Sequence, residues 1–341
     1  MYSLIRKALF LTDPETAHSL ALEGLRLGHV VGATDLLCKP ERQPVTVMGL
    51  HFPNPVGMAA GMDKNGDYID ALGSVGFGFI EVGTVTPRPQ AGNPRPRVFR
   101  LEKARAMINR LGFNNKGVDH LVRQAEKRKF KGILGINISK NSDTPHAKAA
   151  EDYLICLEKV YPHADYITIN ISSPNTRGLR DLQGAEQLDT LLAAINARRQ
   201  QLTQEHGSRV PLVVKVAPDL DDQQITEIAK VVAANEIDGL IATNTTVSRD
   251  AVKGLRHADE QGGLSGAPVK DKANHVLAAF RIALPAEIAL IGTGGIICGE
   301  DAAEKIRLGA DLVQFYTGFV YRGPDLVGDC IKAISAARAQ L

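Results

Sequence analysis

The chain has 341 residues, of which 44% are hydrophobic and 23% are charged, a composition typical of a globular protein with a full-sized core. Its formal net charge of +2 and the lack of a basic segment argue against nucleic acid as a partner. The four cysteines form neither a C-x-x-C pair nor a metal-ligand spacing, so we expect no bound metal and reduced thiols in a cytosolic compartment.

Residues 1–40 differ in pattern from the remainder of the chain and are predicted to form a short helical extension. The segment 3–10 places its apolar side chains on one face, and Asp13 can cap a second helix in which Pro14 takes the first position. Both helices are too short to span a bilayer, and no run of about 18 apolar residues occurs elsewhere, but the helices could lie in a membrane interface. From these residues alone, a helical lid that closes the bottom of the following domain is the favoured interpretation.

Residues 41–341 alternate short apolar runs with longer amphipathic segments, and we predict that they form one domain. The apolar runs do not alternate with polar residues, as expected of strands buried on both faces. They lie at residues 56–60, 79–82, 133–137, 166–170, 212–216, 239–243, 289–292 and 312–315. Helical patterns between them include residues 117–129, 153–160, 185–205, 222–235, 269–284 and 299–308.

Because helices separate the strands, the strands must be parallel, with right-handed crossovers. Eight such strands predict an α/β fold that closes into a (β/α)₈ barrel, the TIM barrel. A doubly wound open sheet is the alternative, but it usually offers a single ligand crevice, whereas here polar residues follow nearly every strand.

The polar residues at the strand ends are the strongest functional signal in the chain, because barrel enzymes carry their active sites there. In chain order, these ends hold residues 60–64, 83–84, 137, 170–175, 215, 243–245, 294–295 and 316–318. Asparagine, threonine and lysine are costly at the end of a buried strand unless a ligand or partner satisfies them. A single member such as Asn175, within a Ser-Pro-Asn sequence, has an equal chance of being only a turn residue.

Glycines after the sixth, seventh and eighth strands indicate a phosphorylated ligand, because they let backbone N–H groups approach a phosphate. They occur in the sequences GGLSG at 262–266, GTGG at 292–295 and YTG at 316–318. No G-x-G-x-x-G follows the first strand, which argues against a Rossmann dinucleotide site. Lys64 and Lys215 suit an anionic ligand or a reduced flavin, although each taken alone could be a surface residue.

Seven segments together resemble the quinone-dependent (class 2) dihydroorotate dehydrogenases over essentially the whole chain. They are AAGMDKNG at 59–66, EVGTVTPRP at 81–89, NRLGFNN at 109–115, NISSPNT at 170–176, VKVAPD at 214–219, ATNTT at 242–246 and GGLSG at 262–266. The resemblance implies an FMN-dependent oxidoreductase of de novo pyrimidine (UMP) biosynthesis, which oxidises dihydroorotate to orotate and passes the electrons to a membrane quinone.

The resemblance also implies the site residues. Those for FMN are Ala60, Gly61, Met62, Asp63, Lys64, Thr84, Asn137, Asn170, Lys215, Thr243, Gly266, Gly295, Tyr316 and Thr317. Those for dihydroorotate are Lys64, Asn109, Arg110, Leu111, Gly112, Phe113, Asn170, Asn175, Asn244 and Thr245. Asparagine suits a pyrimidine ring edge, because its amide both donates and accepts hydrogen bonds.

Ser173 resembles the family's general base, which takes a proton from C5 of dihydroorotate while hydride passes from C6 to flavin N5. Members that use soluble electron acceptors typically carry cysteine at this position, so the serine also indicates the class. A serine hydroxyl is a weak base that needs a dry site and a proton relay, for which Thr176 or an ordered water would serve. Without the resemblance, the sequence SSPN at 172–175 is interpreted as a turn.

The resemblance changes the interpretation of residues 1–40 from a lid to a membrane-facing tunnel through which quinone reaches the flavin. His18, Arg100 and Tyr316 match positions associated with the quinone site. We accordingly expect a monomer that is peripherally bound at the cytoplasmic face of the inner cell membrane. One alternative is a related flavin barrel that uses fumarate or NAD, and another is a non-enzymatic barrel that binds a phosphate or nucleotide.

Overall fold

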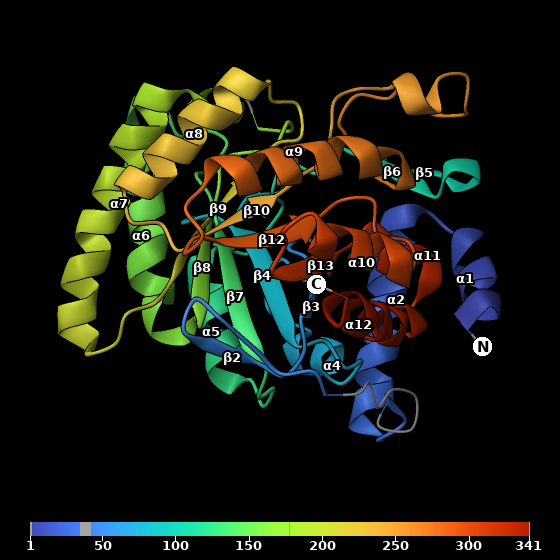
Figure 1. Ribbon diagram of the computed structural model, residues 1–341. Coiled ribbons are helices and arrows are strands. Elements are labelled where there is room, and N and C mark those ends of the chain that lie inside the picture. Colours follow the sequence, from blue (N-terminus) through green and yellow to red (C-terminus); the bar gives the residue numbers. More distant parts are fainter. Residues whose placement is uncertain (1, 35–41, 177, 341) are drawn as a thin grey trace.

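The computed structural model describes residues 2–34, 42–176 and 178–340. Eight parallel strands close into a barrel in the order β10-β12-β13-β3-β4-β7-β8-β9 (Figure 1). Their bounds are β3 Val56–Met58, β4 Phe79–Val85, β7 Ile133–Ile138, β8 Tyr166–Asn170, β9 Leu212–Val216, β10 Gly239–Ala242, β12 Ala289–Thr293 and β13 Leu312–Phe315. The predicted TIM barrel is confirmed, and each predicted strand lies within three residues of its observed bounds.

Helices surround the barrel, with α6, α7 and α8 in succession along one side (Figure 1). Their bounds are α4 Ile69–Gly73, α5 Val118–Lys127, α6 Ala149–Val160, α7 Ala185–His206, α8 Asp222–Ala234, α9 Lys270–Ala283, α10 Gly299–Arg307, α11 Thr317–Arg322 and α12 Asp325–Arg338. Asp221 caps α8 through a capping box with Gln224, which explains why this helix begins where the sequence predicts. The helices α4, α11 and α12 are not among the predicted ranges.

Most barrel strands divide their side chains between two cores. On β8, Ile167 and Ile169 pack into the core beneath the helices, whereas Tyr166 belongs to a second core inside the barrel. Because both faces are buried, the strands are mostly apolar, and even the polar Thr168 of β8 is enclosed. A polar residue on an inward-facing position is therefore enclosed in the barrel interior and must find its partners there.

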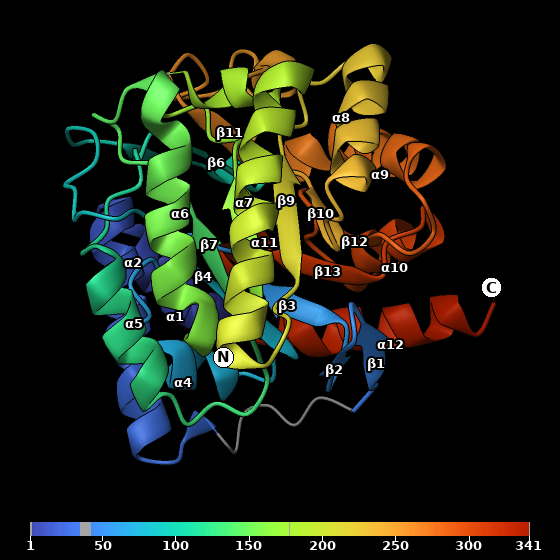
Figure 2. The ribbon, with the colours of Figure 1, turned by 90° about the vertical axis from the view of Figure 1, so that its left-hand side faces the viewer.

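A two-stranded hairpin closes the bottom of the barrel, at the N-terminal ends of its strands. The hairpin consists of β1 (Val45–Val47) and β2 (Leu50–Phe52), and the rings of Phe52 and Phe79 meet edge to face with centroids 5.4 Å apart. Figure 2 shows it at the opposite end from β6 (Ala106–Asn109) and β11 (Gly263–Gly266). The favoured interpretation of the N-terminal helices as a bottom lid is therefore wrong, because the hairpin takes that position.

An antiparallel sheet of three strands, in the order β11-β6-β5, lies near the opposite end of the barrel. Its third member is β5 (Val98–Leu101). The glycine-rich segment at 262–266 therefore contains a strand, β11, in addition to the loop that we predicted. The remaining regular segments are 3-10 turns, namely η1 Glu102–Ala104, η2 His146–Lys148, η3 Tyr161–His163, η4 Leu179–Gln183, η5 Asp250–Val252 and η6 Ala267–Val269.

The N-terminal extension forms two helices, α1 (Tyr2–Phe10) and α2 (Pro14–Val30), as predicted. The Asp13 side chain accepts hydrogen bonds from the backbone of Glu15 and Thr16 at 3.0 Å, so it is the expected cap of α2. Arg97 on the loop before β5 binds Glu15 of α2 at 2.7 Å, which fastens the extension beside the barrel mouth. The predicted domain boundary after residue 40 lies outside the described residues.

The outer surface of the extension is strongly apolar. Leu4 is 70% exposed, Leu11 is 89% exposed and Leu27 is 62% exposed. In the described part of the chain, no helix is both long enough and apolar enough to cross a bilayer.

Candidate active site

A cavity opens at the C-terminal ends of the barrel strands, where the sequence places its polar residues. Most residues that we assigned to FMN line it, namely Ala60, Gly61, Lys64, Thr84, Asn170, Lys215, Thr243, Gly266, Gly295, Tyr316 and Thr317. Most of those assigned to dihydroorotate line it as well, namely Lys64, Asn109, Leu111, Gly112, Phe113, Asn170, Asn175, Asn244 and Thr245. Ser173 also lines it. Residues from strands far apart in sequence thus converge on one cavity.

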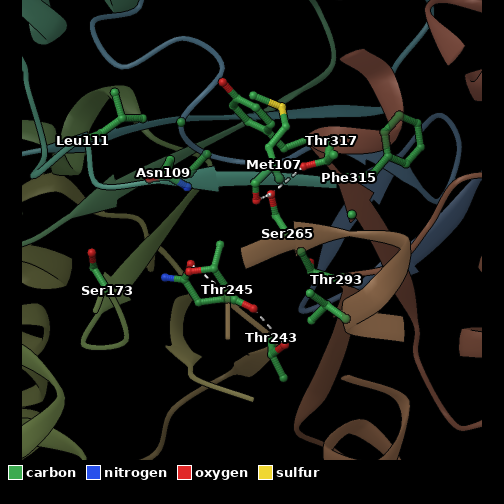
Figure 3. Close-up of a pocket in the computed structure, with 18 of the residues that line it drawn as sticks. Met107, Asn109, Leu111, Ser173, Thr243, Thr245, Ser265, Thr293, Phe315 and Thr317 are labelled. Atoms are coloured by element: carbon green, nitrogen blue, oxygen red, sulfur yellow. Dashed lines mark hydrogen bonds between the residues drawn. The ribbon is translucent and has the colours of Figure 1, made fainter. Parts of the chain in front are cut away.

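The labelled residues of the cavity lie on two sides of it. In Figure 3, Ser173, Asn109 and Leu111 lie on one side, and Thr293, Phe315 and Thr317 lie on the other. The first side carries Asn109 and the candidate base. The second side carries the hydroxyls of Thr293 and Thr317, which suit a phosphate.

Four assigned residues do not line this cavity. Met62 and Asp63 line a neighbouring cavity, and Asn137 is fully buried behind Thr84. The guanidinium of Arg110 points away from the cavity, where it forms an ion pair with Glu260 at 2.7 Å. Its position in the NRLGFNN segment gave no indication of that orientation.

A connected set of amides and hydroxyls lies beneath the cavity. Asn170 donates hydrogen bonds to the Thr84 hydroxyl at 3.0 Å and to Oδ1 of Asn137 at 3.1 Å. Its own Oδ1 accepts from the backbone and the hydroxyl of Ser172, at 3.2 and 3.1 Å. Asn244 donates to the same Ser172 hydroxyl at 3.0 Å. The amides of the site are therefore held by one another as well as by the backbone.

Ser173 has the dry surroundings that a weak base needs. Its side chain is 6% exposed, and its Oγ accepts a hydrogen bond from the backbone N–H of Asn175 at 3.3 Å. The buried hydroxyl of Thr176 has no hydrogen-bond partner among the described residues. A hydroxyl in that condition is available to receive or pass on a proton.

The two lysines differ in their surroundings. Lys215 points into the barrel interior and is 5% exposed, so it is not the surface residue that the sequence left as an alternative. Burial lowers the pKa of Lys215, and the Glu81 carboxylate opposes that shift. Lys64 donates to the backbone oxygen of Gly61 at 2.9 Å, and burial lowers its pKa to about 8. With a pKa of about 8, Lys64 remains mostly protonated at neutral pH.

Two positions in the glycine loops around the cavity accept only glycine. Gly295 has a φ of 82°, and a Cβ there would lie 2.4 Å from Cα of Lys270. Gly266 has a φ of 97°, and a Cβ there would lie 2.3 Å from the backbone oxygen of Arg105. Nearby, the Thr293 hydroxyl is buried with no partner among the described residues. Such a cradle of backbone and hydroxyl donors fits a phosphate group.

A second cavity of about 630 Å³ lies between the extension and the barrel. It contains the three residues that we assigned to the quinone site, His18, Arg100 and Tyr316. The rings of His18 and Tyr316 stack with centroids 6.5 Å apart, and burial lowers the pKa of His18 to about 4. Arg100 donates to the backbone oxygens of Phe10 and Thr12 at 2.9 and 2.6 Å. The two cavities adjoin, because Lys64 and Tyr316 line both.

One residue that connects the substrate loops was missed. Arg180 donates to the backbone oxygen of Ser172 at 3.0 Å and to that of Thr245 at 2.8 Å, and it forms an ion pair with Asp219 at 2.9 Å. It therefore ties the loop after β8 to the loop after β10. The local sequence, in which Arg180 resembles any solvated arginine, contains no signal for this contact.

The comparisons with known proteins agree with one another. Residues 43–337 match the family model described as "Dihydroorotate dehydrogenase". Over the full chain, the sequence is 54% identical to "Dihydroorotate dehydrogenase (quinone)" of Azotobacter vinelandii, covering 98% of that protein. It is 57% identical to the protein of the same description from Dechloromonas aromatica, covering 98% of both chains. A crystal structure of "DHODH in complex with ferulenol from Eimeria tenella" superposes with a TM-score of 0.87 at 36% identity, over 96% of this chain and 92% of that one.

Proposed function

The chain belongs to the dihydroorotate dehydrogenase family, and from this premise we propose that its two adjoining cavities carry out the two half-reactions of the enzyme. The protein is an FMN-dependent oxidoreductase of pyrimidine biosynthesis that oxidises dihydroorotate to orotate and uses a quinone as electron acceptor. We assign dihydroorotate oxidation to the cavity at the strand ends and quinone reduction to the cavity beneath the extension. The observation that carries this division is that the two cavities share lining residues, namely Lys64, Val98, Met107, Leu111 and Tyr316.

The residues at the strand ends fit FMN. Backbone N–H groups at Gly266 and Gly295, with the Thr317 hydroxyl, would hold the phosphate. The buried ammonium of Lys215 would offset negative charge that develops on the reduced ring system. Of the other residues assigned to FMN, Asn137 would act from behind Thr84, and Met62 and Asp63 from the side of the second cavity. The chemistry that FMN would supply here is acceptance of the hydride from C6 of dihydroorotate and transfer of the electrons to the quinone.

The chain's own residues bind and deprotonate dihydroorotate in this proposal. Asn109, Asn175 and Asn244 present amides to the polar edge of the pyrimidine ring, and Lys64 attracts its carboxylate. Ser173 takes the proton from C5 as general base. The unpartnered hydroxyl of Thr176, three residues further on, supports its assignment as the relay that carries this proton away.

We further propose that the extension holds the protein peripherally on the cytoplasmic face of the inner membrane, as a monomer. The exposed leucines of α1 and α2 offer an apolar face of the kind that enters the headgroup region of a bilayer. The 630 Å³ cavity lies directly under these helices, so a quinone dissolved in the membrane could enter it without crossing water. His18 and Arg100, at the cavity wall, would provide its polar contacts.

The proposal is tested by offering different electron acceptors to the purified protein. The protein should be yellow and should be bleached by dihydroorotate, which a non-enzymatic phosphate-binding barrel would not be. Dihydroorotate oxidation should then proceed with a quinone and fail with fumarate or NAD offered separately. Turnover with fumarate or NAD at the quinone rate would overturn the assignment of the second cavity. The absence of bleaching would overturn that of the first.

A further inference from the structure

Glu81 is a buried carboxylate that none of the assigned roles uses. It lies in the middle of β4, between two residues of the outer core, so its side chain faces the barrel interior, and it is 0% exposed. Three donors converge on it. They are the amide of Asn137 at 2.7 Å and the hydroxyls of Tyr166 and Thr168 at 3.0 and 3.2 Å.

A carboxylate only accepts hydrogen bonds, and this property fixes the orientation of Asn137. The two ends of an asparagine amide have nearly the same shape, so only its partners determine which end faces which way. Since Asn137 must turn its NH₂ toward Glu81, its oxygen must face the other way. That oxygen accepts from the Thr84 hydroxyl at 2.6 Å and from the Asn170 amide at 3.1 Å.

The same constraint passes on to the substrate side of the cavity. Asn170 uses its NH₂ to donate to Asn137, so its Oδ1 is the end that accepts from Ser172. The Ser172 hydroxyl donates there and in turn accepts from Nδ2 of Asn244 at 3.0 Å. Oδ1 of Asn244 then accepts from the backbone of Thr245 at 2.8 Å. A continuous, directional chain of hydrogen bonds thus runs from the barrel interior to the loop after β10.

We propose that Glu81 is a positioning residue that fixes which way the amides of the cofactor and substrate sites face. These amides belong to Asn137, Asn170 and Asn244. If one of them turned over, two acceptors or two donors would face each other in a buried site, which is costly because neither can turn to water instead. Glu81 therefore sets the pattern of donors and acceptors that meets FMN and dihydroorotate, a ligand assignment that rests on the proposed function.

The proposal is tested by reversing one hydrogen bond of the chain and then restoring it. Asn137→Asp replaces the donor to Glu81 by a second acceptor. In the double variant Glu81→Gln/Asn137→Asp, the glutamine NH₂ can donate to the introduced carboxylate, while the glutamine oxygen still accepts from Tyr166 and Thr168. The introduced carboxylate then accepts from Thr84 and Asn170, as the Asn137 oxygen does in the natural chain. The assays are run at several values between about pH 7 and pH 9, with every variant compared at the same pH, because the two neighbouring carboxylates of the single variant can share a proton.

The readouts are the FMN content of the purified holoprotein and the KM and kcat for dihydroorotate. We expect Asn137→Asp to lose FMN and to raise the KM by about tenfold or more, and the double variant to recover most of both. Glu81→Leu should resemble Asn137→Asp. The matched control is Gln314→Leu, because Gln314 also faces the barrel interior, is fully buried, and has no hydrogen-bond partner among the described residues. It should keep FMN and KM within about twofold, which separates positioning from a general loss of buried polarity.

The double variant decides the outcome, since it preserves side-chain volume even if Glu81→Leu fails to fold. A double variant no better than Asn137→Asp would overturn the proposal, and so would a Glu81→Leu protein that matches the Gln314→Leu control. The FMN contents test Glu81 independently of catalysis. If dihydroorotate fails to bleach the natural protein, the proposed function is wrong, whereas the FMN series still tests the hydrogen-bond chain.

Discussion

The charge on Lys64 should make the binding of orotate, the anionic product, depend on pH. Lys64 lines both cavities and donates to the backbone oxygen of Gly61. Burial lowers its pKa to about 8, and the neighbouring Arg97 adds to this shift, while Glu15 opposes it. The lysine is a cation below that pH and neutral above it. Its attraction for a carboxylate should therefore be complete below about pH 7 and be lost as the pH rises through 8.

The magnitude follows from the titration. If only the protonated lysine binds the ligand, the apparent Kd rises in proportion to one plus the ratio of neutral to charged lysine. With a pKa of about 8, the Kd should rise about twofold at pH 8, about 11-fold at pH 9 and about 100-fold at pH 10. A lysine with the ordinary pKa of about 10.4 would leave the Kd nearly constant to pH 9.

The assay is a titration of the oxidised holoprotein with orotate, followed by the flavin absorbance between about pH 6 and pH 10. Lys64→Arg is the matched control, because arginine keeps its charge throughout this range and also reveals any titration of orotate itself. Above pH 8, the natural protein should bind orotate more weakly relative to this variant. If the Kd of the two proteins changed with pH in parallel, then either the pKa of Lys64 is not near 8 or Lys64 does not contact the orotate carboxylate.

Four further predictions concern the other assigned residues. Ser173→Ala should keep its FMN but slow flavin reduction by dihydroorotate by roughly 10² or more, and near-normal bleaching would exclude Ser173 as the base. Lys215→Ala should lower the FMN content and the rate of flavin reduction together, and its assignment fails if neither changes. Arg180→Met should lower kcat/KM for dihydroorotate by about tenfold with full FMN content, as measured by steady-state kinetics, whereas unchanged kinetics would show that the two loops need no clamp. Removal of residues 1–36 should leave a yellow protein that dihydroorotate still reduces, while reoxidation by a long-chain quinone and binding to lipid vesicles fall sharply and a small water-soluble acceptor suffers less. A folded truncation that reduces long-chain quinone at the full rate would show that the extension is only a cover.

The barrel could be predicted because its strands have a local signature. A strand such as Gly239–Ala242 is buried on both faces, so its burial appears in the sequence as an unbroken apolar run. The strands that were missed lack such a run. β1 has only three residues, and β11 consists of Gly-Leu-Ser-Gly and is held by its pairing with β6, more than 150 residues earlier in the chain. A pairing over that distance leaves no local pattern.

The candidate site was predictable to the extent that its residues lie at strand ends. Asn170, Lys215 and Thr243 could be placed in this way, because the topology alone brings those ends together. The direction of a side chain could not be predicted. Arg110 turns outward to Glu260, although the residues on either side of it, Asn109 and Leu111, line the cavity. The direction of Glu81 was also unpredictable, because a charged residue inside an apolar strand indicates burial but not which of the two cores its side chain enters.

The place of the extension follows from how the barrel is filled. Below the site, the barrel interior is packed with Phe79, Tyr166 and Leu312 and closed by the β1–β2 hairpin, so no second substrate can approach from that end. An electron acceptor too apolar to cross water must therefore arrive at the open end, next to the cofactor. The helices α1 and α2 lie at that end, over a cavity that shares Tyr316 with the active site, and the exposed Leu4 and Leu27 are not among the residues that line it. In the function that we propose, the closed bottom and the open, apolar mouth lead the quinone and dihydroorotate to the same cofactor from neighbouring cavities.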